Sequence, residues 1–138
     1  MSTSLPSTTA DVVRRYYAVA GDLSAPEGDL AALLDPEVRI VEHPNAVTPD
    51  GAVRGREETL AGFRASRGLL RDQEFVVREL VVDGDRAAVR AHWRATIGTT
   101  RGPLTEGTRL EASIASFLTI ADGRIVDQET FDCYAPFA

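Results

Sequence analysis

Residues 75–96, FVVRELVVDGDRAAVRAHWRAT, decide the fold of this chain. Residues 75–82 are rich in β-branched side chains, which is typical of a strand. Asp83-Gly84-Asp85 is a hairpin-turn signal, and residues 87–96 then predict a second long strand. A tight turn between two long strands forces them to pair antiparallel. This stretch therefore predicts a β-hairpin at the centre of the chain.

The C-terminal part repeats the same pattern. After a loop over residues 98–107, apolar and polar side chains alternate from Leu110 to Ile120. Asp122-Gly123 predicts a turn, and residues 125–134 predict the last strand. Four consecutive strands with mostly short connections predict an antiparallel sheet.

The N-terminal part has helical spacing instead. Apolar side chains recur from Val12 to Ala20 behind a capping threonine, Thr8 or Thr9, and a short second helix is expected from about Glu27 to Leu34. A short strand over residues 38–43, a Pro/Gly-rich loop over 44–55 and a third helix over 56–69 follow. This order predicts an α+β fold in which three helices pack on the concave face of a strongly curved, mostly antiparallel sheet. Such a cone-shaped barrel has a mouth suited to a small ligand.

Length and charge limit the possible functions. The 138 residues predict one domain, residues 10–138, after a polar lead-in over residues 1–9 that we expect to be disordered. The lead-in lacks the features of a secretory signal, and no apolar run approaches the about 20 residues of a membrane span. The net charge of −6, without a basic stripe, argues against a nucleic-acid partner.

Cysteine and histidine usage adds two expectations. Cys133 is the only cysteine, so no intrachain disulfide can form and a reducing, cytoplasmic location fits. Its simplest role is that of a small, semi-buried apolar residue. His43 and His92 are the only histidines, and no spacing of His, Asp and Glu predicts a metal site.

The stretch Val41-Glu42-His43-Pro44-Asn45 is the first candidate for chemistry. It ends an apolar run just ahead of the Pro/Gly-rich loop. His43 is the natural proton carrier because its unperturbed pKa of about 6.5 lies near neutrality. Alternation along the strand puts His43 on the face of the apolar Val41, which we expect to point inward, and leaves Glu42 solvated. The alternatives are a surface histidine or one bonded to the backbone.

Asp132 and Tyr16 are the other candidates for catalysis. Asp132 lies among Phe131, Cys133 and Tyr134, where an ionised carboxylate is costly unless it is paired. It could orient His43, act as a base itself, or form a salt bridge at the rim of the cavity. Tyr16 could donate a hydrogen bond to a developing oxyanion, or could be a core aromatic residue.

The chain resembles the nuclear transport factor 2-like superfamily, and within it the SnoaL-like group of polyketide cyclases, ketosteroid isomerases and limonene epoxide hydrolases. The resemblance spans about residues 11–137. It rests on Val12-Val13-Arg14-Arg15-Tyr16-Tyr17, Gly21-Asp22-Leu23, Val41-Glu42-His43-Pro44, Gly55-Arg56-Glu57 and Asp122-Gly123-Arg124-Ile125. A shared fold of this kind hosts many chemistries and also non-catalytic binders.

The resemblance carries over only in part to the catalytic residues. In the isomerase comparison His43 takes the place of the catalytic aspartate, Tyr16 matches the oxyanion-binding tyrosine, and Ala115 stands where the second donor is expected. The epoxide hydrolases use an Asp-Arg-Asp set, for which the middle strand here offers Arg90 and His92, and Thr130 stands where the second aspartate would fall. The resemblance also implies that Asp132 faces the cavity together with Gln128 and Thr130. The looser pattern of the SnoaL-type cyclases, with Asp and His groups in an apolar cone, fits better.

The strand over residues 87–96 leaves one question open. Arg90, His92 and Arg94 share one face, whereas Val89, Ala91 and Trp93 share the other, and either face could line the cavity. Arg90, His92 and Trp93 are therefore all candidates for substrate binding. The remaining binding candidates are Phe63, Phe117, Gln128 and Thr130.

Three functions follow from these candidates. The first is a cofactor-independent acid–base enzyme of isomerase, cyclase or dehydratase type, acting on a small apolar carbonyl or polycyclic substrate, with His43 as base, Asp132 tuning it and Tyr16 as donor. The second is a small-ligand-binding module without chemistry, and the third is epoxide hydrolase-like activation of water. A homodimer is expected because alternating apolar residues on the outside of the sheet need covering. Chemistry that uses His43 together with Asp132 depends on the two side chains sharing one water-poor hollow.

Overall fold

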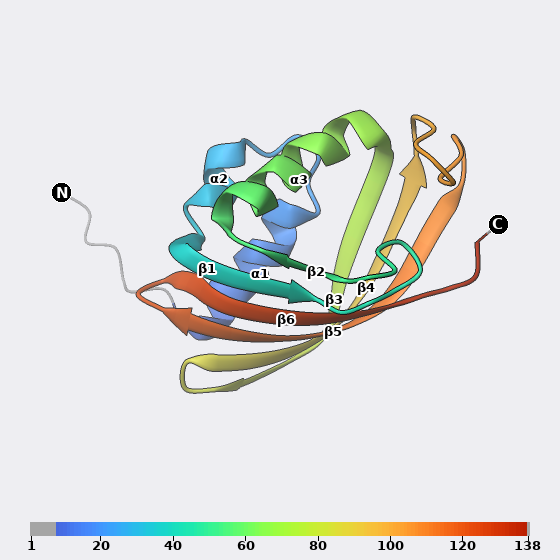
Figure 1. The fold of residues 1–138 in the computed structure, drawn as a ribbon. Helices are drawn as coiled ribbons and strands as arrows, with labels where there is room; N and C mark the ends of the chain where they lie inside the picture. The colour runs from blue at the N-terminus through green and yellow to red at the C-terminus, as the bar shows by residue number, and fades with distance from the viewer. Residues whose placement is uncertain (1–7, 138) are drawn as a thin grey trace.

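The computed structural model describes residues 8–137, which form three helices and a six-stranded curved sheet that does not close (Figure 1). The elements are α1 (Thr9–Ala20), α2 (Glu27–Ala31), β1 (Leu34–Glu42), β2 (Ala52–Arg54), α3 (Arg56–Leu69), β3 (Leu70–Asp83), β4 (Arg86–Ile97), β5 (Arg109–Ala121) and β6 (Arg124–Tyr134). None of the helices in this part of the chain is both long and apolar enough to cross a membrane. The predicted α+β class is confirmed.

The sheet is mixed, with strand order β2-β1-β6-β5-β4-β3. The chain from β3 to β6 is antiparallel throughout, as the turn signals predict, and Phe75 is paired with Trp93 and Ile114 with Asp132. β1 instead runs parallel to β6, with Glu42 paired to Thr130, and β2 is antiparallel to β1. The early strand therefore enters the sheet next to the last one, and this pairing joins the two ends of the fold.

The helices begin where the sequence predicts. Thr8 caps α1: its hydroxyl accepts from the Asp11 amide at 3.0 Å, and its own amide donates to the Asp11 carboxylate at 3.3 Å. Glu58 accepts from the Gly55 amide at 3.1 Å at the start of α3. Of the predicted lead-in, residues 1–7 lie outside the described residues, whereas Thr8 is the cap and Thr9 the first residue of α1.

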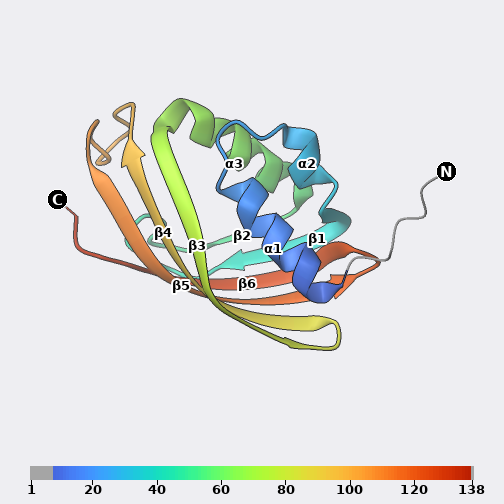
Figure 2. The same ribbon diagram turned by 180° about the vertical axis from the view of Figure 1, so that it is seen from behind.

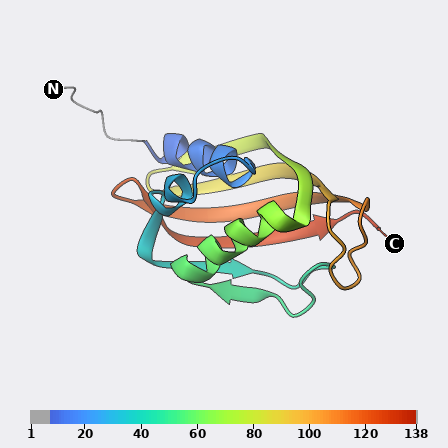
Figure 3. The same ribbon diagram turned by 90° about the horizontal axis from the view of Figure 1, so that it is seen from above.

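The three helices lie together on one side of the sheet (Figures 1, 2 and 3). We call the sheet face toward them the inner face and the opposite one the outer face. Along β5 the buried inner residues alternate with outer ones that are exposed, such as Ile114 with Ala115, or half-buried, as at Thr119. Small inner side chains on β4, among them Ala87 and Ala91, are buried in the core. The core thus lies between the inner face and the helices.

Two elements differ from the predictions. β2 was predicted as loop, because three residues are too few to show alternation. α2 ends at Ala31, earlier than expected, and β1 begins at Leu34 and passes through Pro36. That proline lies in the part of β1 where the register with β6 shifts, between Leu34 and Arg39, so no ladder hydrogen bond is lost there.

Candidate functional site

Two adjoining hollows, of about 250 and 360 Å³, lie between the inner face and helices α1 and α3. Their walls are mostly apolar and aromatic, and a few titratable side chains from β1 and β6 enter them. The residues that line both hollows are Tyr16, Glu42, Thr59, Gly62, Phe75, Ile114 and Asp132. Apolar concave sites with a few convergent polar groups are where proteins bind small molecules.

Asp132 lies on β6, facing the hollows. Its Oδ1 accepts a hydrogen bond of 2.7 Å from the Thr130 hydroxyl, and no basic side chain of residues 8–137 forms an ion pair with it. Burial raises the pKa of the Asp132 carboxyl above its ordinary value; the Thr130 hydrogen bond opposes this, the charge of Glu42 adds to it, and Arg54 opposes it. Asp132 is therefore a carboxyl group that can exchange a proton more readily near neutral pH than an exposed aspartate.

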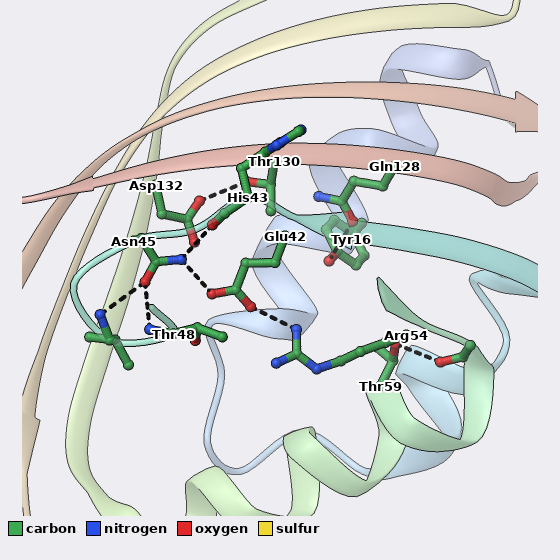
Figure 4. A network of polar contacts seen from close by, with 12 residues as sticks. Tyr16, Glu42, His43, Asn45, Thr48, Arg54, Thr59, Gln128, Thr130 and Asp132 are labelled. Atoms are coloured by element: carbon green, nitrogen blue, oxygen red, sulfur yellow. Dashed lines mark hydrogen bonds and ion pairs between the residues drawn. The ribbon is translucent and has the colours of Figure 1, made fainter. Parts of the chain in front are cut away.

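Glu42 enters the same hollows from β1 but is fully paired (Figure 4). Its Oε1 accepts from Arg54 Nη1 at 2.7 Å, and its Oε2 accepts from Asn45 Nδ2 at 2.8 Å. Burial alone would raise the pKa of this carboxyl, but the hydrogen bonds from Asn45, Arg54 and Thr48 together lower it below its ordinary value. Glu42 is thus held in its ionised form.

The loop after β1 is organised around Asn45. Its Oδ1 accepts from the amides of Val47 and Thr48, at 3.0 and 2.9 Å. Its Nδ2 donates to Glu42 and also to the His43 carbonyl, at 2.9 Å. One side chain therefore both folds the loop and holds the buried carboxylate.

A hydrogen bond joins Tyr16 of α1 to Gln128 of β6 (Figure 4). The Tyr16 hydroxyl donates to Gln128 Oε1 at 3.0 Å, and Gln128 Nε2 donates to the Ser116 hydroxyl at 2.9 Å. Burial raises the pKa of Tyr16, so its hydroxyl stays protonated. Tyr16 is therefore a neutral donor whose proton points to Gln128 in this structure.

Tyr134 and Trp93 line the larger hollow but not the smaller one. Their rings meet edge to face with centroids 6.1 Å apart, and Trp93 Nε1 donates to Gln73 Oε1 at 3.0 Å. Burial raises the pKa of Tyr134, and the charges of Asp132 and Glu42 raise it further. The Tyr134 hydroxyl therefore lies in the field of both carboxylates and stays protonated.

His43 is not in the hollow. Its side chain lies on the outer face, where the ring stacks on Phe131 with centroids 4.1 Å apart and Nε2 is 3.5 Å from Glu129 Oε2. The expectation that His43 and Asp132 share one water-poor site is therefore wrong. The reason is strand parity: Leu34, Val38 and Ile40 are the buried residues of β1, so Glu42 continues their face and Val41 and His43 take the other.

The structure also settles the orientation of β4. Arg90 and His92 lie on the outer face, where Arg90 pairs with Glu79 at 3.3 Å and His92 Nε2 lies 2.8 Å from Glu111 Oε1. Trp93 is the β4 residue that lines the larger hollow. Substrate contacts of Arg90 and His92 inside the hollow are thus excluded.

Of the remaining binding candidates, three line the hollows and one does not. Phe63 lines the larger hollow, and Gln128 and Thr130 line the smaller one. Phe117 lies on the outer face and is 49% exposed, because it occupies an outward position in the alternation of β5.

Sequence reasoning missed four residues that shape the site: Glu42 as an inward group, Arg54, Asn45 and Tyr134. Extending the face of Val38 and Ile40 by two residues would have found Glu42. Arg54 gives no such signal, because it depends on the unexpected pairing of β2 with β1. As for metals, residues 8–137 contain no group of three or more His, Cys, Asp or Glu side chains placed to hold an ion.

The arrangement supplies the parts of acid–base chemistry. Asp132 offers a carboxylate oxygen without an ion-pair partner, Glu42 a fixed negative charge, and Tyr16 and Tyr134 neutral O–H donors. Two carboxylates whose environments move their pKa values in opposite directions divide into one that titrates and one that does not. In an apolar hollow the electrostatic interactions of such groups with a substrate are stronger than in water.

Comparisons with known proteins agree with the fold. A family model described as a SnoaL-like domain matches residues 13–128, and no curated protein matches the chain. IdmH from Streptomyces antibioticus, a provisionally assigned polyketide cyclase, is similar in structure: identity is 25%, the TM-score is 0.74, and the match covers 90% of this chain and 91% of IdmH.

Two further solved structures, below 25% identity, show the fold alone. A provisionally assigned SnoaL-like polyketide cyclase from Jannaschia sp. CCS1 is 19% identical with a TM-score of 0.72, over 96% of this chain and 91% of that one. An LEH-like epoxide hydrolase from M. tuberculosis is 15% identical with a TM-score of 0.68, over 90% of this chain and 81% of that one.

Proposed function

The chain belongs to the SnoaL-like domain family, as its sequence led us to expect, and we propose that it is a cofactor-independent acid–base enzyme. The proposed reaction begins with removal of a proton next to a carbonyl group, as in isomerisation, aldol cyclisation or dehydration. The substrate class is a small, mostly apolar carbonyl compound or a polycycle, because the hollows are walled mainly by apolar and aromatic side chains.

The observation that carries the proposal is the contrast between Asp132 and Glu42. Both enter one hollow, but Glu42 is held by Arg54 and Asn45, whereas Asp132 has only the Thr130 hydroxyl as a hydrogen-bond partner within residues 8–137. The pKa of Glu42 is lowered and that of Asp132 is raised. Asp132 is therefore the group suited to take up and return a proton, and Glu42 supplies the charge that strengthens it as a base.

In the proposed step, an oxygen of the Asp132 carboxylate takes a proton from the carbon next to the carbonyl. The electron pair of that C–H bond moves into the new C=C bond, and the carbonyl oxygen gains the negative charge. Tyr134 is the proposed hydrogen-bond donor to that oxygen, because it lines the larger hollow together with Asp132. Tyr16 could add a second donor once its proton turns from Gln128. Return of the proton to a different carbon completes an isomerisation.

In this assignment the general base is Asp132 and no longer His43. Asp132, expected from the sequence either to orient His43 or to act as a base itself, takes the second role. Acid–base groups of this kind contribute about 10² to 10⁴ in rate.

Hydrogen–deuterium exchange into a ketone tests the proposal. With 2-tetralone as a compact, mostly apolar probe, the wild-type protein should accelerate deuterium uptake at the carbon next to the carbonyl, followed by proton NMR in D₂O. Asp132→Asn should lose at least about 10²-fold of the acceleration. Asp127→Asn, a matched change at an outer position of the same strand, should retain it.

Three results would contradict the proposal. Saturable binding of 2-tetralone by wild type without accelerated exchange would favour the ligand-binding alternative. Equal acceleration by wild type and Asp132→Asn would remove Asp132 from the mechanism. Hydrolysis of an apolar epoxide such as styrene oxide, lost in Asp132→Asn while ketone exchange is absent, would favour activation of water.

A further inference from the structure

Asn45 connects the loop over residues 43–51 to the charge of the site. It is part-buried, and both the oxygen and the nitrogen of its side-chain amide form hydrogen bonds. The carbonyl oxygen accepts from two loop amides, and the amino group donates to Glu42 Oε2 and to the His43 carbonyl. No spare hydrogen-bonding group is left to contact a substrate, so Asn45 acts on the site through Glu42 and through the loop that it holds.

Glu42 in turn cannot leave its position without breaking contacts to two elements. Arg54 reaches its Oε1 from β2 at 2.7 Å, and Asn45 reaches its Oε2 from the loop at 2.8 Å. The Glu42 side chain is only 14% exposed, so the loss of either donor would leave its carboxylate less well compensated. Such a carboxylate takes up a proton more readily, and its charge would no longer be constant.

Protonation of Glu42 would change how readily Asp132 takes up a proton. Glu42 is paired in register with Thr130, and Asp132 lies two residues further along β6 on the same face. If Glu42 were neutral, Asp132 would lose the repulsion that favours its protonated form, and the two carboxyl groups would compete for one proton. The difference between the fixed charge and the proton carrier therefore depends on the donors of Glu42.

We infer that Asn45 is a positioning residue that decides which of the two carboxyl groups titrates: it keeps Glu42 ionised and leaves the proton-carrier role to Asp132. The inference rests on the proposed function for its catalytic consequence. Its effect on Glu42 is a separate property that holds with or without turnover.

Asn45→Asp is the sharpest variant, because it separates the two tasks of the side chain. A carboxylate at position 45 can still accept from the amides of Val47 and Thr48, so the loop keeps its turn. It cannot donate to Glu42, and it places a second negative charge against Glu42 Oε2 instead. The pKa of Glu42 should then rise, because both the lost donor and the new repulsion favour its protonated form.

The control is Ala46→Asp, which adds the same charge at an exposed position of the same loop. Carboxyl ¹³C NMR titrations of glutamate-labelled protein, with the Glu42 signal assigned through Glu42→Gln, should show a clearly larger upward shift of the Glu42 midpoint in Asn45→Asp than in Ala46→Asp. Equal shifts in the two variants would overturn the inference.

A double variant keeps the test decisive if Asn45→Asp folds poorly. In Glu42→Gln/Asn45→Asp the amide of position 42 can donate to the carboxylate at 45 while its oxygen still accepts from Arg54, which restores the contact with donor and acceptor exchanged. The double variant should melt at a higher temperature than Asn45→Asp alone. A double variant that is no more stable would contradict direct coupling between the two positions.

Exchange of 2-tetralone protons supplies the catalytic readout. In wild type the rate should fall with acid along a limb set by Asp132 alone, whereas in Asn45→Asp that limb should become broader because two groups titrate. A shifted Glu42 midpoint without wild-type exchange would refute the proposed function and leave the role of Asn45 intact. Wild-type exchange with an unshifted midpoint would do the reverse.

Discussion

At the scale of single residues, the molecule places two carboxyl groups in one hollow and treats them differently. Glu42 has two donors on its two oxygens, so the energetic cost of burying its charge is offset by hydrogen bonds. Asp132 has one hydroxyl donor and remains unpaired by a cation among the described residues. A partly buried carboxylate with too few donors to offset its charge is typical of functional positions, and it lowers the stability of the fold.

Asp132→Asn should therefore stabilise the protein at neutral pH while it removes the proposed base. The folded-state pKa of Asp132 is raised above its unfolded value, so its contribution to stability is fully present below the unfolded pKa and is lost as the pH rises through the folded pKa. At pH 7 the ionised form opposes folding, and asparagine removes that charge. Urea unfolding at pH 7 should show a gain of about 0.5–2 kcal/mol in the free energy of unfolding.

The same measurement below pH 3.5 supplies the contrast. There the Asp132 carboxyl is protonated in both states, and the gain should disappear. Asp127→Asn, at a position where the aspartate side chain is 48% exposed, should show no comparable gain at either pH. A destabilised Asp132→Asn at pH 7 would contradict the reading of Asp132 as a costly buried charge.

At the scale of elements, local patterns predicted most of the fold. The bounds of α3 match the helix predicted over residues 56–69, and the turns before β4 and β6 lie where Asp-Gly sequences stand. The parallel pairing of β1 with β6 was out of reach, because it joins segments about ninety residues apart and leaves no mark in either one.

The candidate site was predicted less well than the fold, for a reason that lies in β1. Choosing the inward face from the apolar Val41 placed His43 inside and Glu42 outside, the reverse of the structure. A buried glutamate contradicts side-chain hydropathy unless its partners are known. Those partners, Arg54 on β2 and Asn45 in the loop, come together only in the folded chain.

Gly51 is the glycine that leaves the least room for a Cβ. Its φ is +69°, and a Cβ there would lie 2.7 Å from the Glu42 carbonyl oxygen, where backbone cannot yield easily. Gly51→Ala should thus disturb the pairing of β2 with β1 and cost about 1–3 kcal/mol in the free energy of unfolding, measured by urea titration. Arg54 would lose its fixed approach to Glu42 as a consequence.

A second glycine in α3 gives the matched control. Gly68 is helical and a Cβ there would meet nothing within 4 Å, so Gly68→Ala should stabilise the protein by up to about 1 kcal/mol. If Gly51→Ala were as stable as wild type, the loop would not constrain β1 and β2 in the way described above.

At the scale of the whole molecule, the two faces of the sheet have different tasks. The inner face packs against the helices and forms the hollows, whereas the outer face is uncovered in the single chain. Its aromatic centre is formed by His43, Phe117 and Phe131. The His43 ring stacks on Phe131, and the Phe131 and Phe117 rings meet edge to face with centroids 6.2 Å apart. Charged and polar side chains lie on the same face: Arg39 pairs with Asp127 at 4.0 Å, and His92 Nε2 lies 2.8 Å from Glu111 Oε1.

An exposed aromatic centre within a charged rim is the composition of a protein–protein interface, so the homodimer expected from the sequence remains our prediction. Phe117 and Phe131 are 49% and 37% exposed, and contact with a second copy of the chain would remove that apolar surface from water.

In sedimentation velocity at micromolar concentration, wild type should sediment as a dimer and Phe117→Asp as a monomer with an unchanged far-UV spectrum. Val82→Asp, which adds the same charge at a 41% exposed apolar position on the opposite sheet face, should remain dimeric. A monomeric wild type would contradict the prediction and leave the aromatic centre without a covering partner of its own kind. Dissociation by Val82→Asp but not by Phe117→Asp would move the interface away from the outer face altogether.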